Sequence, residues 1–167
     1  MPKPVVASSF RRNTFHGGED VTGGVQTFEI GDFLTLDATS GEVRECINAD
    51  TVFLGLAEGA ASGVVATEVA VHELFPGDIL QLDIYDLHAA AAVDASTLVD
   101  GQVCAVCTVG GEWYAEIQNT GATTAILNAV AFIKSQGPLR DEQYGNTVYR
   151  GLFRVLEAVC VTVNGAA

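Results

Sequence analysis

A seven-residue motif occurs twice in the chain and constrains its fold more than any other feature. Gly-Asp-Phe-Leu-Thr-Leu-Asp stands at residues 31–37, and Gly-Asp-Ile-Leu-Gln-Leu-Asp stands at residues 77–83. Glycine permits the backbone angles of a tight turn, and the following aspartate can bond to the backbone of that turn. The alternation after it is typical of a short strand whose side chains point to opposite faces. Each copy therefore predicts a turn that leads into a β-strand.

Strand and turn signals continue through the rest of the chain. Apolar and polar residues alternate over residues 67–72, and a Gly-Gly pair between residues 103–109 and 113–117 predicts a hairpin. Residues 153–163 predict a long last strand, whereas the alanine-rich residues 86–100 leave helix and capped turn open. We expect an all-β fold, with a compact barrel-like body of short antiparallel strands and little helix.

The charges are unevenly distributed along the chain. Asp and Glu number 21 against 8 Lys and Arg, which gives a net charge of -13. A surface of this sign repels phosphates, so direct binding to nucleic acid is disfavoured. Residues 1–18 differ, because they hold Lys3, Arg11 and Arg12 and no acid. A basic start on an acidic chain predicts a segment that docks onto an acidic surface.

The first 24 residues differ from the rest in pattern as well as in charge. Phe10 and Phe15 lie there, although disordered tails are poor in aromatic residues. We therefore expect residues 1–24 to form an extended N-terminal arm and residues 25–167 to form a single β-rich body. The expected partner-binding residues of the arm are Lys3, Phe10, Arg11, Arg12 and Phe15. A disordered terminus that happens to be basic is the alternative.

The composition predicts association with other protein surfaces. Hydrophobic residues make up 49% of the chain and charged residues only 17%, so few charges are available to cover the surface. We expect a homo-oligomer, with a trimer favoured over a dimer. No run approaches the roughly 18 apolar residues of a membrane span, and no signal peptide is recognisable, so we expect synthesis in the cytoplasm and no membrane partner.

Two groups of residues have the composition of metal or redox sites. The first is the pair Cys104 and Cys107, which has zinc or redox spacing. On a strand, however, positions three apart face opposite sides, so buried thiols are favoured. The second contains His72 and His88, which could bind a metal together with Asp83, Asp86 or Glu73, while Asp78, Asp83 and Asp86 could bind calcium. Their spacing matches no common ligand set, and the EF-hand calcium pattern is absent. We therefore expect no metal and no cofactor.

Signals for catalysis are also weak. No Gly-x-Ser-x-Gly elbow and no glycine-rich phosphate loop occur in the sequence, so we expect no catalytic residues and no enzyme activity. Trp113 and Tyr114 are adjacent on an expected strand, so one should pack in the core and the other outside. A sugar-binding platform on the outer ring is the alternative.

Three stretches resemble the head decoration (cement) proteins of tailed bacteriophages. They are Thr-Phe-Glu-Ile-Gly-Asp-Phe-Leu-Thr-Leu-Asp at residues 27–37 followed by Gly-Glu-Val at residues 41–43, Thr-Val-Phe-Leu-Gly-Leu-Ala-Glu-Gly at residues 51–59, and Tyr-Arg-Gly-Leu-Phe-Arg-Val-Leu-Glu-Ala at residues 149–158. The resemblance is one of pattern over most of the chain. It implies a β-tulip or β-barrel body with an extended N-terminal arm, no catalysis, and oligomers, often trimers, on the outside of the capsid.

The resemblance also implies a role. The chain would bind the major capsid protein on the exterior of the virion and stabilise the shell by bridging capsid subunits. A protein that bridges capsid subunits needs buried contact area and several binding contacts at once, and it needs no catalytic residues. We call such a bridging protein a clamp. The alternatives are another β-rich virion component, such as a tail or adaptor subunit, and a carbohydrate-binding β module.

Overall fold

The computed structural model describes residues 4–8, 14–16, 18–20, 25–47, 49–86, 91–92, 98–116, 126–140 and 147–157. Within these residues the chain forms twelve β-strands and no α-helix. The expected all-β fold class is confirmed. A membrane-spanning helix is likewise not found in the part of the chain that the structure describes.

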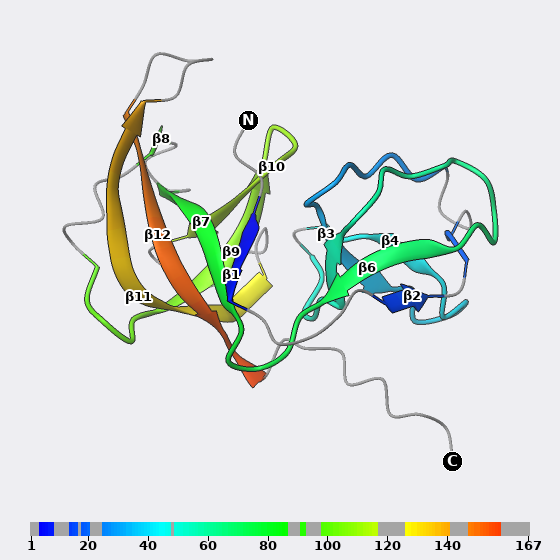
Figure 1. Ribbon diagram of the computed structural model, residues 1–167, viewed down its shortest axis with the longest axis horizontal. Coiled ribbons are helices and arrows are strands. Elements are labelled where there is room, and N and C mark those ends of the chain that lie inside the picture. The colour runs from blue at the N-terminus through cyan, green and yellow to red at the C-terminus, as the bar shows by residue number, and fades with distance from the viewer. Residues whose placement is uncertain are drawn as a thin grey trace.

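The larger sheet has seven strands and closes into a barrel. Its strands are β1 (Val5–Ser8), β7 (Ile79–Asp86), β8 (Ala91–Ala92), β9 (Val103–Val109), β10 (Glu112–Glu116), β11 (Ile126–Arg140) and β12 (Thr147–Val155). Five of them follow the order β7-β10-β9-β11-β12. Strand β12 also pairs with β7, which closes the ring (Figure 1). Strands β1 and β8 each pair with β7 outside this ring. The β9–β10 hairpin was expected from its Gly-Gly pair and is confirmed. In contrast to the expected short antiparallel strands, β10 and β7 run parallel and β11 has 15 residues.

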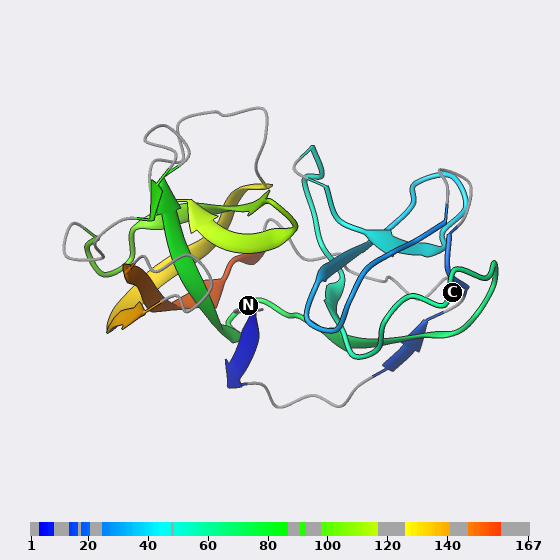
Figure 2. The ribbon, with the colours of Figure 1, turned by 90° about the horizontal axis from the view of Figure 1, so that it is seen from above.

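The remaining strands form a smaller curled sheet beside the barrel. They are β2 (Thr14–His16), β3 (Phe33–Leu36), β4 (Val43–Glu45), β5 (Gly55–Ala57) and β6 (Val69–Glu73). Their order is β2-β6-β5-β3-β4, and each neighbouring pair is antiparallel. We call this part the small sheet. Figure 2 shows it next to the barrel, with β6 leading directly into β7.

One hydrophobic core joins the barrel to the small sheet. It contains Phe33 and Phe53 from the small sheet together with Trp113 and Phe153 from the barrel. The ring of Phe33 lies 5.1 Å from that of Trp113 and 5.0 Å from that of Phe53. Each aromatic side chain buried in this way contributes about 1.5–3 kcal/mol. The other face of the small sheet buries a second cluster that includes Phe28.

The two copies of the repeated motif form the same turn. Gly31 and Gly77 have φ angles of 90° and 96°, which glycine adopts without strain. In each copy the aspartate accepts a hydrogen bond from the backbone N–H three residues earlier, at 2.7 Å for Asp32 and 2.9 Å for Asp78. The turn and strand predicted from the motif are therefore confirmed in both places.

The two turns also make the same contacts with distant strands. The glycine of the first turn donates to the carbonyl of Ala57, and the N–H of Ala57 donates to the carbonyl of Asp32. In the second turn, Val155 exchanges the equivalent pair of bonds with the glycine and Asp78. Each copy thereby fastens the start of its strand to the end of another strand.

Two parts of the expected N-terminal arm pair with the body. Strand β1 pairs with β7 of the barrel, and β2 pairs with β6 of the small sheet. The segment that we expected to extend away as residues 1–24 thus contributes one edge strand to each sheet. At the other end of the chain, the last strand was expected over residues 153–163, but β12 begins earlier, at Thr147, and ends at Val155. Leu156 and Glu157 lie outside the strand, and residues 158–163 lie outside the described residues.

Candidate functional site

The β5–β6 loop (residues 58–68) is held in place by a buried glutamate. Glu19 is fully buried, and its carboxylate accepts hydrogen bonds from the N–H of Ser62, the hydroxyl of Ser62 and the N–H of Gly63, each at 2.8 Å. Hydrogen bonds to a charged acceptor are the stronger class. Serine suits this position because it supplies two donors, and Gly63 supplies a φ of 71°.

The backbone around Glu19 links the same loop to β4. Its N–H donates to the carbonyl of Thr67 at 3.0 Å, and the residue forms a parallel bridge with Val43 on its other side. Gly18 packs so closely that a Cβ there would stand 2.3 Å from the Cα of Ala66. The loop is therefore fixed to the edge of the small sheet by both side-chain and backbone bonds.

Ala66 adds strain to this loop. Among the described residues it is the one non-glycine residue with a positive φ, at 60°. A left-handed backbone costs an ordinary residue about 1–2 kcal/mol. Such strain persists only where the surroundings impose it, and it is frequent at functional sites.

The loop displays exposed valines at its tip. Val64 and Val65 are 59% and 55% exposed, and Val25 is 67% exposed. Val25 lies beside the loop, with its Cγ1 2.9 Å from the place that a Cβ at Gly63 would occupy. We call Val25, Val64 and Val65 the valine patch. Single exposed apolar residues are ordinary, but neighbouring ones on a fixed loop suit a protein contact.

A pocket of about 140 Å³ opens at the base of the same loop. It is lined by Glu19, Phe28, Gly59, Ala60, Ser62, Thr67, Glu68, Val69 and Ala70. Phe28 and Val69 are buried and give it an apolar floor, whereas Glu68 is exposed. Sites for drug-sized ligands measure about 300–1,000 Å³, so this pocket suits a single side chain better.

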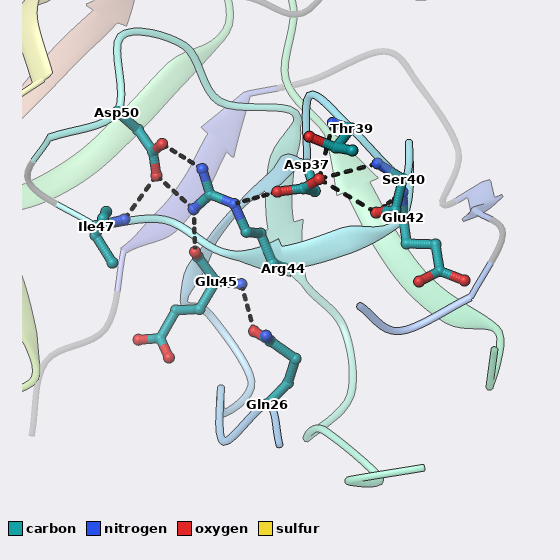
Figure 3. Close-up of polar contacts among 9 residues, drawn as sticks. All are labelled: Gln26, Asp37, Thr39, Ser40, Glu42, Arg44, Glu45, Ile47 and Asp50. Atoms are coloured by element: carbon teal, nitrogen blue, oxygen red, sulfur yellow. Dashed lines mark hydrogen bonds and ion pairs between the residues drawn. The ribbon is translucent and has the colours of Figure 1, made fainter. Parts of the chain in front are cut away.

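The small sheet and its loops, which carry the pocket and the valine patch, are rich in acidic residues. Residues 18–74 contain eleven Asp and Glu residues and one arginine, a formal charge of -10. That arginine, Arg44, is held by two carboxylates of its own sheet (Figure 3). The region therefore has a large excess of negative charge.

The Arg44 network braces β4 (Figure 3). Arg44 forms two hydrogen bonds to the carboxylate of Asp50, at 2.5 and 2.9 Å, and an ion pair with Asp37 at 3.8 Å. The hydrogen bond with Asp50 raises the pKa of Arg44. The N–H groups of Ser40 and then Thr39 lower the pKa of Asp37. These contacts order the turn between β3 and β4.

The barrel has a second group of polar residues on its outer face. Arg150 donates to Asp83 at 2.6 Å, and the hydroxyl of Tyr114 donates to Glu112 at 3.0 Å. The rings of Tyr85 and Tyr114 lie 5.1 Å apart. Trp113 lies in the core and Tyr114 is partly exposed on the opposite face, which confirms the expected division of this pair.

Two of the cysteines, Cys104 and Cys107, lie where the strand pattern predicted. Cys104 packs in the main core and Cys107 on the opposite face of β9. Burial, with a smaller effect from the charge of Glu116, raises the pKa of both thiols to about 12. Burial also raises the pKa of the Cys46 thiol well above its usual value. These thiols therefore carry no appreciable thiolate at neutral pH.

Two of the residues weighed as metal ligands have other partners in the structure. His72 faces Glu58, with its Nδ1 3.5 Å from the carboxylate, whereas Asp83 is bound by Arg150. Within the described residues, no group of three or more His, Cys, Asp and Glu is arranged to hold a metal ion. His88 lies outside the described residues.

Four of the five predicted arm residues fall outside the part of the chain that the structure describes. Lys3, Phe10, Arg11 and Arg12 lie outside the described residues. Phe15 belongs to β2 and pairs in register with Ala70 of β6. Their role in docking stays a prediction.

Sequence reasoning missed the residues of the β5–β6 loop site. Glu19 fell within the expected arm, and no motif singled out Ser62 or Gly63. One signal was available in the sequence, since Glu19 and Asp20 are the first acids after a purely basic start. The structure buries both of them. Buried acids need donors, and a Ser-Gly pair in a distant loop can supply them.

Comparison with known proteins gives no match of any kind. No family model, no curated protein and no solved structure matches this chain. The resemblance to phage head decoration proteins therefore stays a prediction.

Proposed function

We propose that this chain is a non-enzymatic structural protein of a virion. In this role it binds the outside of an icosahedral phage capsid and stabilises the shell by bridging subunits of the major capsid protein. The observation that carries the proposal is the valine patch, which presents exposed apolar side chains from a loop fixed to a rigid body. The sequence resemblance supports the same role.

The core shared by the two sheets suits a protein that bridges capsid subunits. The barrel and the small sheet share one hydrophobic core, so a force applied to one part is transmitted to the other. A clamp between capsid subunits gains from this stiffness because a rigid body loses little conformational entropy on binding.

Assembly into a homo-oligomer completes the proposal, with a trimer favoured. Each exposed valine contributes about 1–2 kcal/mol when it is covered, which is weak for one contact. Three linked copies make the second and third contacts intramolecular, and this raises the overall affinity by orders of magnitude.

The test uses shells of the virus that encodes the chain, assembled without it. Purified protein is added, and occupancy is measured by co-sedimentation while shell melting is followed by calorimetry. We expect saturable binding and a higher melting temperature of the shell. Failure to bind, or binding without any rise in shell melting, would contradict the proposed role.

A carbohydrate-binding module is the second candidate, and one observation favours it. Tyr85 and Tyr114 lie together on the outer face of the barrel. Tyr85 shares β7 with the ion-paired Asp83, and Tyr114 pairs in register with Asp83 from β10. Aromatic rings beside polar groups are suited to sugars. Screening against a glycan array distinguishes the two roles, because a capsid clamp should bind no glycan.

Localising the protein in the virion by immunogold labelling separates a head clamp from a tail or adaptor subunit.

A further inference from the structure

We propose that the pocket at the base of the β5–β6 loop receives an arginine or lysine side chain of a protein partner, and that the valine patch covers apolar surface next to that side chain. This inference rests on the proposed function, since it names the face of the protein that docks and the chemistry of the surface that it meets.

The first argument is that the site is formed before any partner binds. Three hydrogen bonds from the loop to Glu19 and a strained Ala66 hold the loop in one conformation. A contact made by a fixed loop loses little conformational entropy on binding. Nothing in the stability of the small sheet requires Val64 and Val65 to be apolar, because both are more than half exposed.

The second argument is the shape and lining of the pocket. Its volume of about 140 Å³ accommodates one side chain. Phe28, Val69 and Ala70 offer an apolar wall, and the exposed Glu68 brings a carboxylate to the same space. Glu19 also lines the pocket, but its buried carboxylate is bound by the loop and contributes only its charge. Arginine and lysine combine a long apolar stem with a cationic head, so they match both parts of this lining. Arginine is also among the residues that most often dominate binding energy at interfaces.

The third argument is the net charge of the small sheet and its loops, which carry the pocket and the valine patch. Residues 18–74 carry a formal charge of -10. A symmetric contact through this face between two copies would bring two such charges together, and like charges across an interface are unfavourable. The partner is therefore a different surface, with an apolar centre and a rim of lysine or arginine. Under the proposed function, this surface belongs to the major capsid protein.

The experiment compares variants at the site with matched variants on the barrel. Glu68→Lys reverses the charge at the pocket, and Val64→Asp places a charge in the valine patch. Asp100→Lys and Val99→Asp make the same changes on a barrel turn, where Asp100 is exposed and Val99 is 66% exposed. All four positions are exposed, so we expect the thermal unfolding midpoints to match that of the wild type.

Binding to shells is measured by co-sedimentation over a range of protein concentrations. We expect each site variant to bind at least about tenfold more weakly than the wild type, and each barrel variant to bind within about twofold of it. If the site variants bind as well as the barrel variants, the inference is wrong and the proposed function still stands.

A wild-type protein that does not bind shells would contradict the proposed function, and the pocket is then tested alone. N-acetyl-arginine amide is titrated into the wild-type protein, with N-acetyl-glutamine amide as the neutral control, and amide chemical shifts are followed by NMR. Saturable shifts at Ser62, Gly63 and Ala70 that require the guanidinium and are lost in Glu68→Lys would support the pocket as a cation-binding site. Absence of such shifts would overturn the inference.

Discussion

Glu19 provides the sharpest test of how the β5–β6 loop is held. Replacing it with alanine removes the acceptor of three hydrogen bonds, two from Ser62 and one from Gly63. A hydrogen bond to a charged group contributes about 1.5–3 kcal/mol. Two terms reduce the total, because the exposed Ser62 can donate to water instead and because the buried carboxylate no longer has to be desolvated. We expect the Glu19→Ala variant to lose about 2–4 kcal/mol of its free energy of unfolding.

Urea unfolding followed by far-UV circular dichroism measures this loss. Glu68→Ala is the control, because it removes an acid from the same loop at an exposed position and should change the free energy of unfolding by less than about 0.5 kcal/mol. Hydrogen exchange adds a local readout, since the amides of Ser62 and Gly63 should lose protection in Glu19→Ala. If the two variants unfold at the same urea concentration, Glu19 does not hold the loop and the reasoning is refuted.

Three further predictions concern other features of the chain. Ala66→Gly should raise the free energy of unfolding by about 0.5–1 kcal/mol in urea titrations, because glycine adopts the positive φ without strain; a loss of stability would contradict this. Cys104 and Cys107 should remain unmodified by iodoacetamide in the native protein at pH 8 and react on unfolding, because their pKa is about 12; mass spectrometry that finds rapid native labelling would oppose it. The double variant Arg11→Glu, Arg12→Glu should bind shells more weakly and with less dependence on salt, as measured by co-sedimentation from low to high ionic strength, and unchanged binding would show that the arm does not dock.

The local features of the fold could be predicted from the sequence because they depend on neighbouring residues. The turns at Gly31 and Gly77 follow from the conformational freedom of glycine and the backbone-bonding side chain of aspartate. The opposite orientation of Cys104 and Cys107 follows from the period of a strand. Each of these predictions needed only a few residues of sequence.

The pairing of strands could not be predicted in the same way. The parallel contact between β7 and β10, and the closure of the barrel by β12, join segments whose match depends on the packing of the whole core. The pairing of β1 with β7 and of β2 with β6 was missed because charged residues and prolines dominate the pattern of the first residues. The loop site was missed for a related reason, since the partners of Glu19 lie 43 and 44 residues away.

The repeated turn also bears on the order in which the chain can fold. The first copy is fastened to Ala57, only 25 residues after Asp32, whereas the second is fastened to Val155, 77 residues after Asp78. Contacts between distant residues form more slowly because a longer loop must close. During synthesis the strands β3 to β6 can pair soon after they leave the ribosome, but β7 must wait for β12, which lies near the end of the chain. Until then one edge of β7 is open to other chains, and a ribosome that stalls before residue 147 leaves a product prone to aggregation.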